Sequence, residues 1–94
     1  MPHVIQHNRE KHRFEVTLNG CVAVLEYEEN GNQIAFTHTG VPNEFRGQGI
    51  ASALAKVALE YASERQLTII PLCPYVAAYI ARHRQYQHLL DSGA

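Results

Sequence analysis

The segment 46–52, Arg-Gly-Gln-Gly-Ile-Ala-Ser, has the most informative residue types and spacing in the chain. It joins a strand-like run that ends at Val41 to a strongly helical run that begins at Ile50. Gly47 and Gly49 carry no Cβ, so the backbone can pass close to a bulky group. The helix points unpaired amides and the positive end of its dipole into the same space, and an arginine beside them supplies a cation. This arrangement predicts a site for phosphate.

A tight turn that needs its glycines only for geometry would show the same local pattern. No Ser, Thr, Asp or Asn stands between Phe45 and Gln48 to cap the helix. An uncapped helix start is unfavourable unless a ligand or water takes its amides, which supports the phosphate interpretation. The two common phosphate motifs, GxxxxGK[ST] and GxGxxG, are absent. The glycine pair alone therefore leaves both interpretations open.

The histidines and cysteines lack the spacing of a metal site or of a disulfide framework. The six histidines form no HxxxH or HExxH pattern. Cys21 and Cys73 lie far apart and form no CxxC pair, so we expect two free thiols. We expect no bound metal.

The first half of the chain predicts antiparallel strands. Apolar and polar residues alternate from Phe14, which is the period of a half-buried strand. Asn19-Gly20 is the sequence of a type I′ hairpin turn. The third main strand should place Ile34, Phe36 and His38 on one face. The expected strands are residues 4–8, 14–19, 21–28 and 33–41.

The period changes after Gly47 to that of an amphipathic helix, and an alanine-rich helix is expected over 50–65. Residues 67–72 are continuously apolar, as expected for a parallel strand covered on both faces, although Pro71 must loosen its pairing. A second helix is expected over 75–83, with a short helical end after it. An antiparallel meander followed by one right-handed βαβ unit gives a mixed α/β (α+β) sheet of about five strands.

Length and charge limit the class of protein. Ninety-four residues are expected to form a single domain, residues 1–94. The formal net charge of −1 provides no field that would favour nucleic acid or an acidic membrane. No apolar run approaches the length of a membrane span, and no basic-then-apolar leader is present. We therefore expect a cytoplasmic protein with neither nucleic-acid nor membrane partners.

The glycine loop and its surroundings resemble a known enzyme family. Residues 46–51 are similar to the [QR]-x-x-G-x-[GA] signature of the GNAT superfamily of N-acetyltransferases, whose loop amides hold the pyrophosphate of acetyl-CoA. Residues 37–42 and 71–80, together with His83, resemble a compact single-domain branch of that superfamily. The resemblance extends from Phe14 to Leu90. It implies an acyl-CoA N-acyltransferase-like fold.

Two features depart from the superfamily pattern. Arg84 stands where a proline commonly follows the histidine in this branch, and we expect it to alter only a turn. Full-length GNAT domains have two further carboxy-terminal strands, for which too few residues follow Ile80. The fold is therefore expected to be truncated at its C-terminus, with an acceptor side that is shallow, open or completed by another molecule.

The resemblance implies a position for the coenzyme. In the superfamily the pantetheine arm lies between the strand before the loop and the parallel strand after the helix. His38 ends the first of these strands and is the candidate general base, because imidazole titrates near neutral pH. A structural histidine packed after Phe36 is the alternative. The implied coenzyme-binding residues are Thr39, Val41, Arg46, Gly47, Gln48, Gly49, Ile50, Ala51 and Ser52.

The remaining catalytic candidates lie at the end of the second strand and in the helix after it. Cys73 could carry the acetyl group covalently, contact the acyl end without reacting, or only pack; the sequence shows no adjacent cation that would lower the pKa of its thiol. Tyr79 is similar in position to the superfamily tyrosine that protonates the coenzyme thiolate. Its alternative is an aromatic cover for the core, and Tyr75 is a second candidate for the acid.

We therefore expect an acetyl-CoA-dependent N-acetyltransferase that acts on a primary amine of a small molecule or on a protein lysine, with acetyl-CoA as cosubstrate. A catalytically weak acyl-CoA-binding or regulatory module is the alternative. A nucleic-acid or protein interaction module is disfavoured, because the chain has no basic–aromatic stripe. The sequence is compatible with a homodimer and does not identify the acceptor amine.

Overall fold

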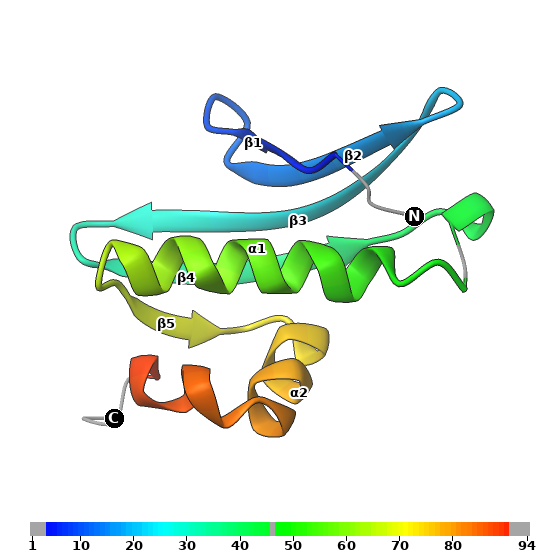
Figure 1. The fold of residues 1–94 in the computed structure, drawn as a ribbon. Coiled ribbons are helices and arrows are strands. Elements are labelled where there is room, and N and C mark those ends of the chain that lie inside the picture. The colour runs from blue at the N-terminus through cyan, green and yellow to red at the C-terminus, as the bar shows by residue number, and fades with distance from the viewer. Residues whose placement is uncertain (1–3, 46, 91–94) are drawn as a thin grey trace.

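Within the part of the chain that the structure describes, five strands form one sheet whose spatial order follows the chain, β1-β2-β3-β4-β5 (Figure 1). The computed structural model describes residues 4–45 and 47–90. The strands are β1 (Gln6–Asn8), β2 (Arg13–Leu18), β3 (Cys21–Asn30), β4 (Gln33–Gly40) and β5 (Thr68–Pro71). The helices are α1 (Ile50–Glu64) and α2 (Pro74–Arg82), with short 3₁₀ helices η1 (Asn43–Phe45) and η2 (Arg84–Leu89).

The first four strands form the antiparallel meander that the sequence predicted. Asn19 and Gly20 have positive φ values of 54° and 79°, as a type I′ turn between β2 and β3 requires. β4 then pairs with β5 in parallel, from Gln33 opposite Thr68 to Phe36 opposite Pro71. Because α1 connects these two parallel strands, the expected βαβ unit is confirmed.

Both helices cover one face of the sheet. α1 packs against β2, β3 and β4, and α2 packs against β4, β5 and α1. The hydroxyl of Tyr86 in η2 donates to Glu60 of α1 at 2.6 Å, so η2 lies on this side too. The core between these layers contains Phe14, Val16, Ala23, Leu25, Tyr27, Ile34, Phe36, Leu54, Ala58, Leu59, Ala62, Ile69, Val76, Tyr79 and Ile80.

The opposite face of the sheet is not covered by a helix of the described residues. The expectation that β5 is covered on both faces is therefore wrong. Ile69 is fully buried toward the helices, whereas its neighbour Ile70 is only half-buried. The run is continuously apolar, but only alternate residues of a strand can face a single helical layer.

A β-bulge in β4 changes the face on which His38 lies. Tyr27 stands opposite Phe36, whereas the adjacent Glu26 stands opposite His38, so Thr37 is an extra residue in β4. Residues directly opposite each other share a face of the sheet, and Glu26 is on the face away from the helices. The prediction that His38 follows Ile34 and Phe36 is therefore wrong, because the extra residue reverses the alternation.

Candidate functional site

The loop before α1 contains two glycines in the left-handed conformation. Gly47 has a φ of 78° and Gly49 a φ of 71°, values that side-chain-bearing residues rarely adopt. A Cβ at either position would meet no protein atom within 4 Å. The backbone angle, rather than crowding by the protein, therefore explains both glycines. Gln48 between them donates from Nε2 to the carbonyl oxygen of Glu44 at 3.2 Å.

The amino terminus of α1 is uncapped by any side chain, as the sequence predicted. Gly49 is the N-cap, and the amide of Ala53 donates to its carbonyl oxygen at 3.0 Å. The amides of Ile50, Ala51 and Ser52 precede this first helical hydrogen bond and point out of the helix end. Gly49 and Ser52 are exposed, so this end faces solvent. Arg46 lies outside the described residues.

The pairing of β4 with β5 ends at Phe36 and Pro71, and Cys73 lies just beyond it, against β4. The amide of Cys73 donates to the carbonyl oxygen of Phe36 at 2.9 Å, beyond the last paired residues. Its Sγ lies 3.2 Å from the Oγ1 of Thr39. Thr39 stands opposite the buried Leu25, so its side chain is on the helix-covered face. The bulge that turns His38 away is what turns Thr39 toward Cys73.

The surroundings of Cys73 favour the thiolate. Cys73 is the N-cap residue of α2 and is 5% exposed. Burial raises the pKa of its thiol, but the Thr39 hydroxyl and the backbone amides of Val76, Tyr75 and Thr39 lower it, and the resulting pKa is below the ordinary value. The sequence showed no cation near this thiol. The structure instead supplies hydrogen-bond donors, two of them from the first turn of α2.

His38 is exposed on the other face of the sheet. A Cβ at Gly40 would lie 3.1 Å from Nε2 of His38, so the imidazole ring covers this glycine. Since Thr39 and His38 point to opposite faces, the structure does not bring His38 to the side of β4 on which Cys73 lies. Val41, which follows, is half-buried and packs against the core.

Tyr79 belongs to an aromatic stack. It is 5% exposed, and its ring is 3.9 Å from the ring of His83 at an interplanar angle of 12°. Nδ1 of His83 is 2.7 Å from the carbonyl oxygen of Tyr79 and holds this stack in place. Tyr79 is thus part of an aromatic cover for the core, which was the alternative to its role as the catalytic acid.

Tyr75 lies nearer to the loop than the sequence indicated. Burial raises the pKa of this phenol above its ordinary value, and the nearby side chain of Ser52, in the first turn of α1, offsets part of this rise. Tyr75 was only the second candidate for the acid. Its helical spacing from Tyr79 was visible in the sequence, but the approach of α2 to the start of α1 was not.

A family model of the GCN5-related N-acetyl-transferases matches residues 13–89. The chain belongs to this family. The GCN5-related domain is also similar to Protein NATD1 from mouse, with 41% identity over 88 residues that cover 90% of this chain and 80% of that protein. Protein NATD1 from zebrafish is 33% identical, with 90% and 80% coverage.

The fold agrees with a solved member of the same family. The solution NMR structure of a GCN5-like protein from Staphylococcus aureus matches with a TM-score of 0.73 and 28% identity. The match covers 94% of this GCN5-related chain and 87% of that one. The mixed α/β fold and the family that the glycine loop indicated are therefore confirmed.

Two further observations concern metals and membranes. Within residues 4–45 and 47–90, no three His, Cys, Asp or Glu side chains come together as metal ligands would. No helix in this described part of the GCN5-related chain is long and apolar enough to cross a membrane.

Proposed function

We propose that this GCN5-related protein is an acetyl-CoA-dependent N-acetyltransferase that moves an acetyl group to a primary amine of a small molecule or of a protein lysine. The observation that carries the proposal is that two features of the structure lie near each other. The first is the uncapped end of α1 with its two left-handed glycines, and Tyr75 of α2 approaches Ser52 there. The second is the end of the pairing between β4 and β5. At that point Thr39 holds the buried thiol of Cys73.

The loop is proposed to bind the pyrophosphate of the coenzyme. The free amides at the start of α1 and the dipole of this 15-residue helix favour an anion there. Arg46, Gly47, Gln48, Gly49, Ile50, Ala51 and Ser52 form this part of the proposed site. The pantetheine arm would then follow the end of β4 past Val41 and Thr39.

The proposed transfer needs a base, a bound thioester and an acid. The amine nitrogen attacks the thioester carbonyl carbon, the C–N bond forms, the C–S bond breaks, and the coenzyme thiolate takes up a proton. His38 is the proposed base and would act from the open face of the sheet. Tyr79 is the proposed acid, and Tyr75, whose hydroxyl is beside Ser52, is its alternative.

Two routes for the acetyl group are compatible with the site. In direct transfer, Cys73 contacts the acyl end and does not react. In the covalent route, the thiolate of Cys73 attacks first, coenzyme A leaves, and the amine then removes the acetyl group from sulfur. The lowered pKa of Cys73 favours the second route more than the sequence did.

A catalytically weak acyl-CoA-binding module is the second candidate function. The position of His38 favours it, because the proposed base lies on the face of β4 opposite to the Thr39–Cys73 pair. In this case the coenzyme would bind at the loop without efficient transfer.

The release of free coenzyme thiol from acetyl-CoA, measured across a panel of primary amines, tests the proposal. We expect release that depends on the amine, that falls at least tenfold in His38→Gln, and that is unchanged in the control Cys21→Ala. Loss of transfer in Cys73→Ala would support the covalent route, and normal transfer would support the direct one. Coenzyme binding without release for any amine would favour the binding module, and absence of both would contradict the proposal.

A further inference from the structure

A cluster of aromatic and charged side chains fixes β1 to the rest of the sheet, away from the candidate site. Tyr61 follows Ile50 by eleven residues, which corresponds to roughly 16 Å along α1. The cluster consists of His7 in β1, Phe14 in β2, Tyr27 and Glu29 in β3, and Tyr61 in α1, with Arg9 and Arg65 beside it. The proposed reaction uses none of these residues.

His7 makes the main side-chain contacts of β1. Its ring stacks on Phe14, with 4.1 Å between ring centroids and an interplanar angle of 17°. It also meets the edge of Tyr61 at 4.7 Å. The strand is only three residues long, and its other two side chains, Gln6 and Asn8, are exposed and half-buried. The His7 ring therefore adds packing on the core to the backbone pairing of β1 with β2 and to the contact of Asn8 with Glu15.

The direction of a hydrogen bond to Tyr27 depends on whether His7 is neutral or protonated. Nε2 of His7 is 2.5 Å from the hydroxyl of Tyr27. Burial, followed by the neighbouring Tyr61 and Glu29, raises the pKa of Tyr27, so its hydroxyl stays protonated and can donate to Nε2 of a neutral His7. A doubly protonated imidazole has no lone pair at Nε2, so a protonated ring would have to donate to the Tyr27 hydroxyl oxygen while its charge lies between the rings of Phe14 and Tyr61.

The charges around His7 also oppose its protonation. The guanidinium of Arg9 is 5.5 Å from the ring centroid of Tyr61, and that of Arg65 is 5.4 Å from it. Burial lowers the pKa of His7 most, Arg9 lowers it further, Glu29 raises it, and Arg65 lowers it again. The Glu29 carboxylate already accepts a hydrogen bond from the Tyr61 hydroxyl at 2.7 Å. The resulting pKa is below the ordinary value of 6.5.

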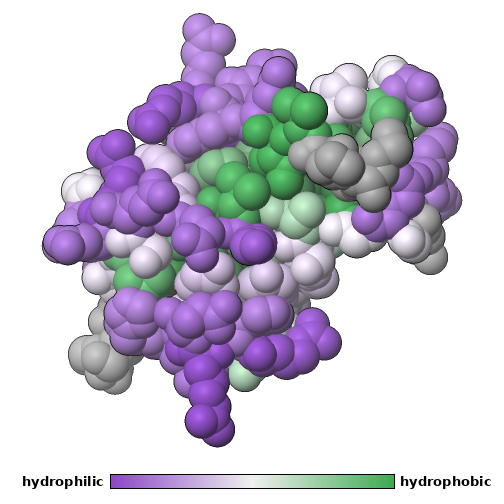
Figure 2. Space-filling model, viewed as in Figure 1, coloured by the Kyte–Doolittle hydropathy of each residue, from purple (hydrophilic) through white to green (hydrophobic). Residues whose placement is uncertain are grey.

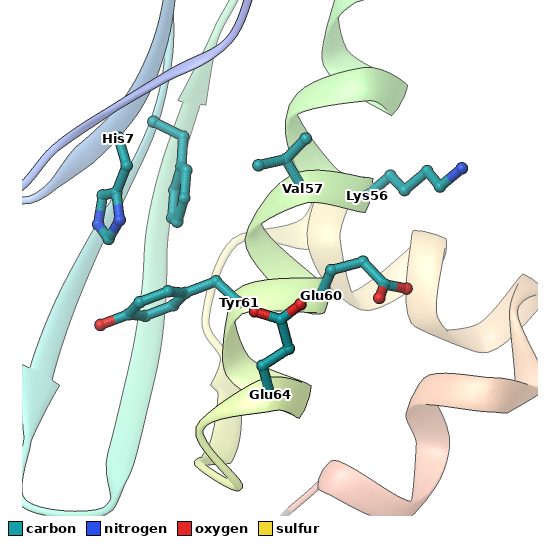
Figure 3. A pocket seen from close by; sticks show the side chains of 7 residues that line it. His7, Lys56, Val57, Glu60, Tyr61 and Glu64 are labelled. Carbon is teal, nitrogen blue, oxygen red and sulfur yellow. The ribbon is translucent and has the colours of Figure 1, made fainter.

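The other charged groups near His7 are open to solvent. His7 lines a hollow of about 450 Å³ between the N-terminal strands and α1, whose charged lining residues are Lys56, Glu60 and Glu64 (Figure 3). Lys56 and Glu60 point away from His7 in this view, and Glu60 accepts a hydrogen bond from Tyr86. Water screens these exposed charges, so they offset the effect of burial only weakly. From the β1–β2 connection, His12 stacks on Tyr27 at 6.0 Å and is the remaining titratable neighbour.

The same region is the apolar part of an otherwise largely hydrophilic face. Figure 2 shows apolar side chains gathered between the N-terminal strands and α1. Val57 of α1 lines the hollow there and is 37% exposed. Phe14, by contrast, is only 1% exposed, and His7 covers it together with Tyr27 and Tyr61. Removal of His7 would therefore expose further apolar surface.

We propose that β1 is a pH-sensitive strap, which stays on the sheet while His7 is neutral and detaches when His7 is protonated. Detachment would uncover Phe14 and leave β2 as the unpaired edge of the sheet, where another strand could pair. The pKa of His7 is lower when β1 is attached to the sheet than when it is free. Neutral His7 therefore stabilises the attached state fully at pH values above the pKa of the free side chain. The stabilisation is lost as the pH falls below about 6.5 toward the value in the attached state.

Amide hydrogen exchange of the full chain between pH 7.5 and 5, corrected for intrinsic rates, tests this strap. A parallel NMR titration of the His7 ring gives its pKa. We expect protection of the β1–β2 amides to fall with pH, by about tenfold for each unit of pKa difference between the free and attached states. Amides of β3 and β4 should stay protected.

His7→Phe keeps an aromatic ring on Phe14 without a titrating group, so protection of β1 should no longer depend on pH. His12→Gln removes the neighbouring imidazole and should behave like the unmodified protein. The proposal would be overturned if the pKa of His7 were at or above 6.5. Protection of β1 that stays constant with pH, or that falls equally in His7→Phe, would overturn it as well.

Discussion

Replacement of Gly49 by alanine tests whether the loop before α1 binds the coenzyme. Gly49 has a φ of 71° and a ψ of 21°, and no protein atom would contact an added Cβ within 4 Å. Holding an L-residue in this left-handed conformation costs about 1–2 kcal/mol. We expect the chain to relieve part of this strain by rotating the first peptide groups of α1 away from the phosphate position.

The expected loss of coenzyme affinity follows from the hydrogen bonds between the loop amides and the phosphate. A hydrogen bond to a charged group contributes about 1.5–3 kcal/mol. Loss of one amide–phosphate contact should therefore weaken coenzyme binding by roughly 10- to 150-fold. The dissociation constant of coenzyme A, measured by isothermal titration calorimetry, reports this change directly.

Gly20→Ala is the matched control for Gly49→Ala. Gly20 has a similar φ of 79° and equally open surroundings, but it lies in the β2–β3 turn. Both variants should lose about 1 kcal/mol of unfolding free energy in urea, because both strain a left-handed position. Only Gly49→Ala should lose affinity. Equal dissociation constants in the two variants would refute the reasoning about the loop.

Three further predictions concern the thiol of Cys73, Tyr86 at the edge of the core and Leu54 at its centre. Thr39→Val should raise the pKa of Cys73 and shift the pH profile of its alkylation to higher pH, whereas Thr39→Ser should not; identical profiles would contradict the role of the 3.2 Å contact. Burial and the bond to Glu60 raise the pKa of Tyr86 to about 12, so its stabilising effect should persist below pH 10 and disappear between pH 10 and 12. Tyr86→Phe should remove that pH dependence and lower the free energy of unfolding by about 1 kcal/mol, and a pH dependence that survives the change would argue against this bond. Leu54→Ala, at a fully buried position of α1, should lower the free energy of unfolding in urea by about 3 kcal/mol, and a loss below 1 kcal/mol would contradict the packing.

Local patterns in the sequence were sufficient to predict the order of elements. The hairpin at Asn19-Gly20 requires two positive φ values, and the residue types at these positions favour them. The alanine-rich amphipathic run predicted α1 to within one residue at its carboxy end. Both features depend on interactions within a few residues, which is why a single sequence shows them.

The candidate site was harder to predict because it depends on one extra residue in β4. An unbroken period of two assigns His38 to the face of Phe36, whereas the bulge at Thr37 assigns Thr39 to that side instead. No residue type around Thr37 marks the bulge. The contact between Thr39 and Cys73 and the altered face of His38 both follow from this bulge. Only the structure could therefore show them.

Contacts between distant elements were the other feature that the sequence did not show. Tyr27 and Tyr61 pack near each other, and their joint contact with His7 brings together β1, β3 and α1. The pairing of Tyr75 with Ser52 likewise joins two helices. Such contacts depend on the path of the chain between the residues rather than on their spacing.

Native mass spectrometry of the protein after incubation with acetyl-CoA tests whether the loop before α1 binds the coenzyme. We expect a non-covalent coenzyme adduct that is weakened in Gly49→Ala and retained in Gly20→Ala. An additional acetyl mass that disappears in Cys73→Ala would identify the covalent route, and its absence alongside the adduct would identify direct transfer. If no coenzyme adduct forms under conditions that preserve weak complexes, the assignment of this GCN5-related protein as an acetyl-CoA-dependent transferase is contradicted.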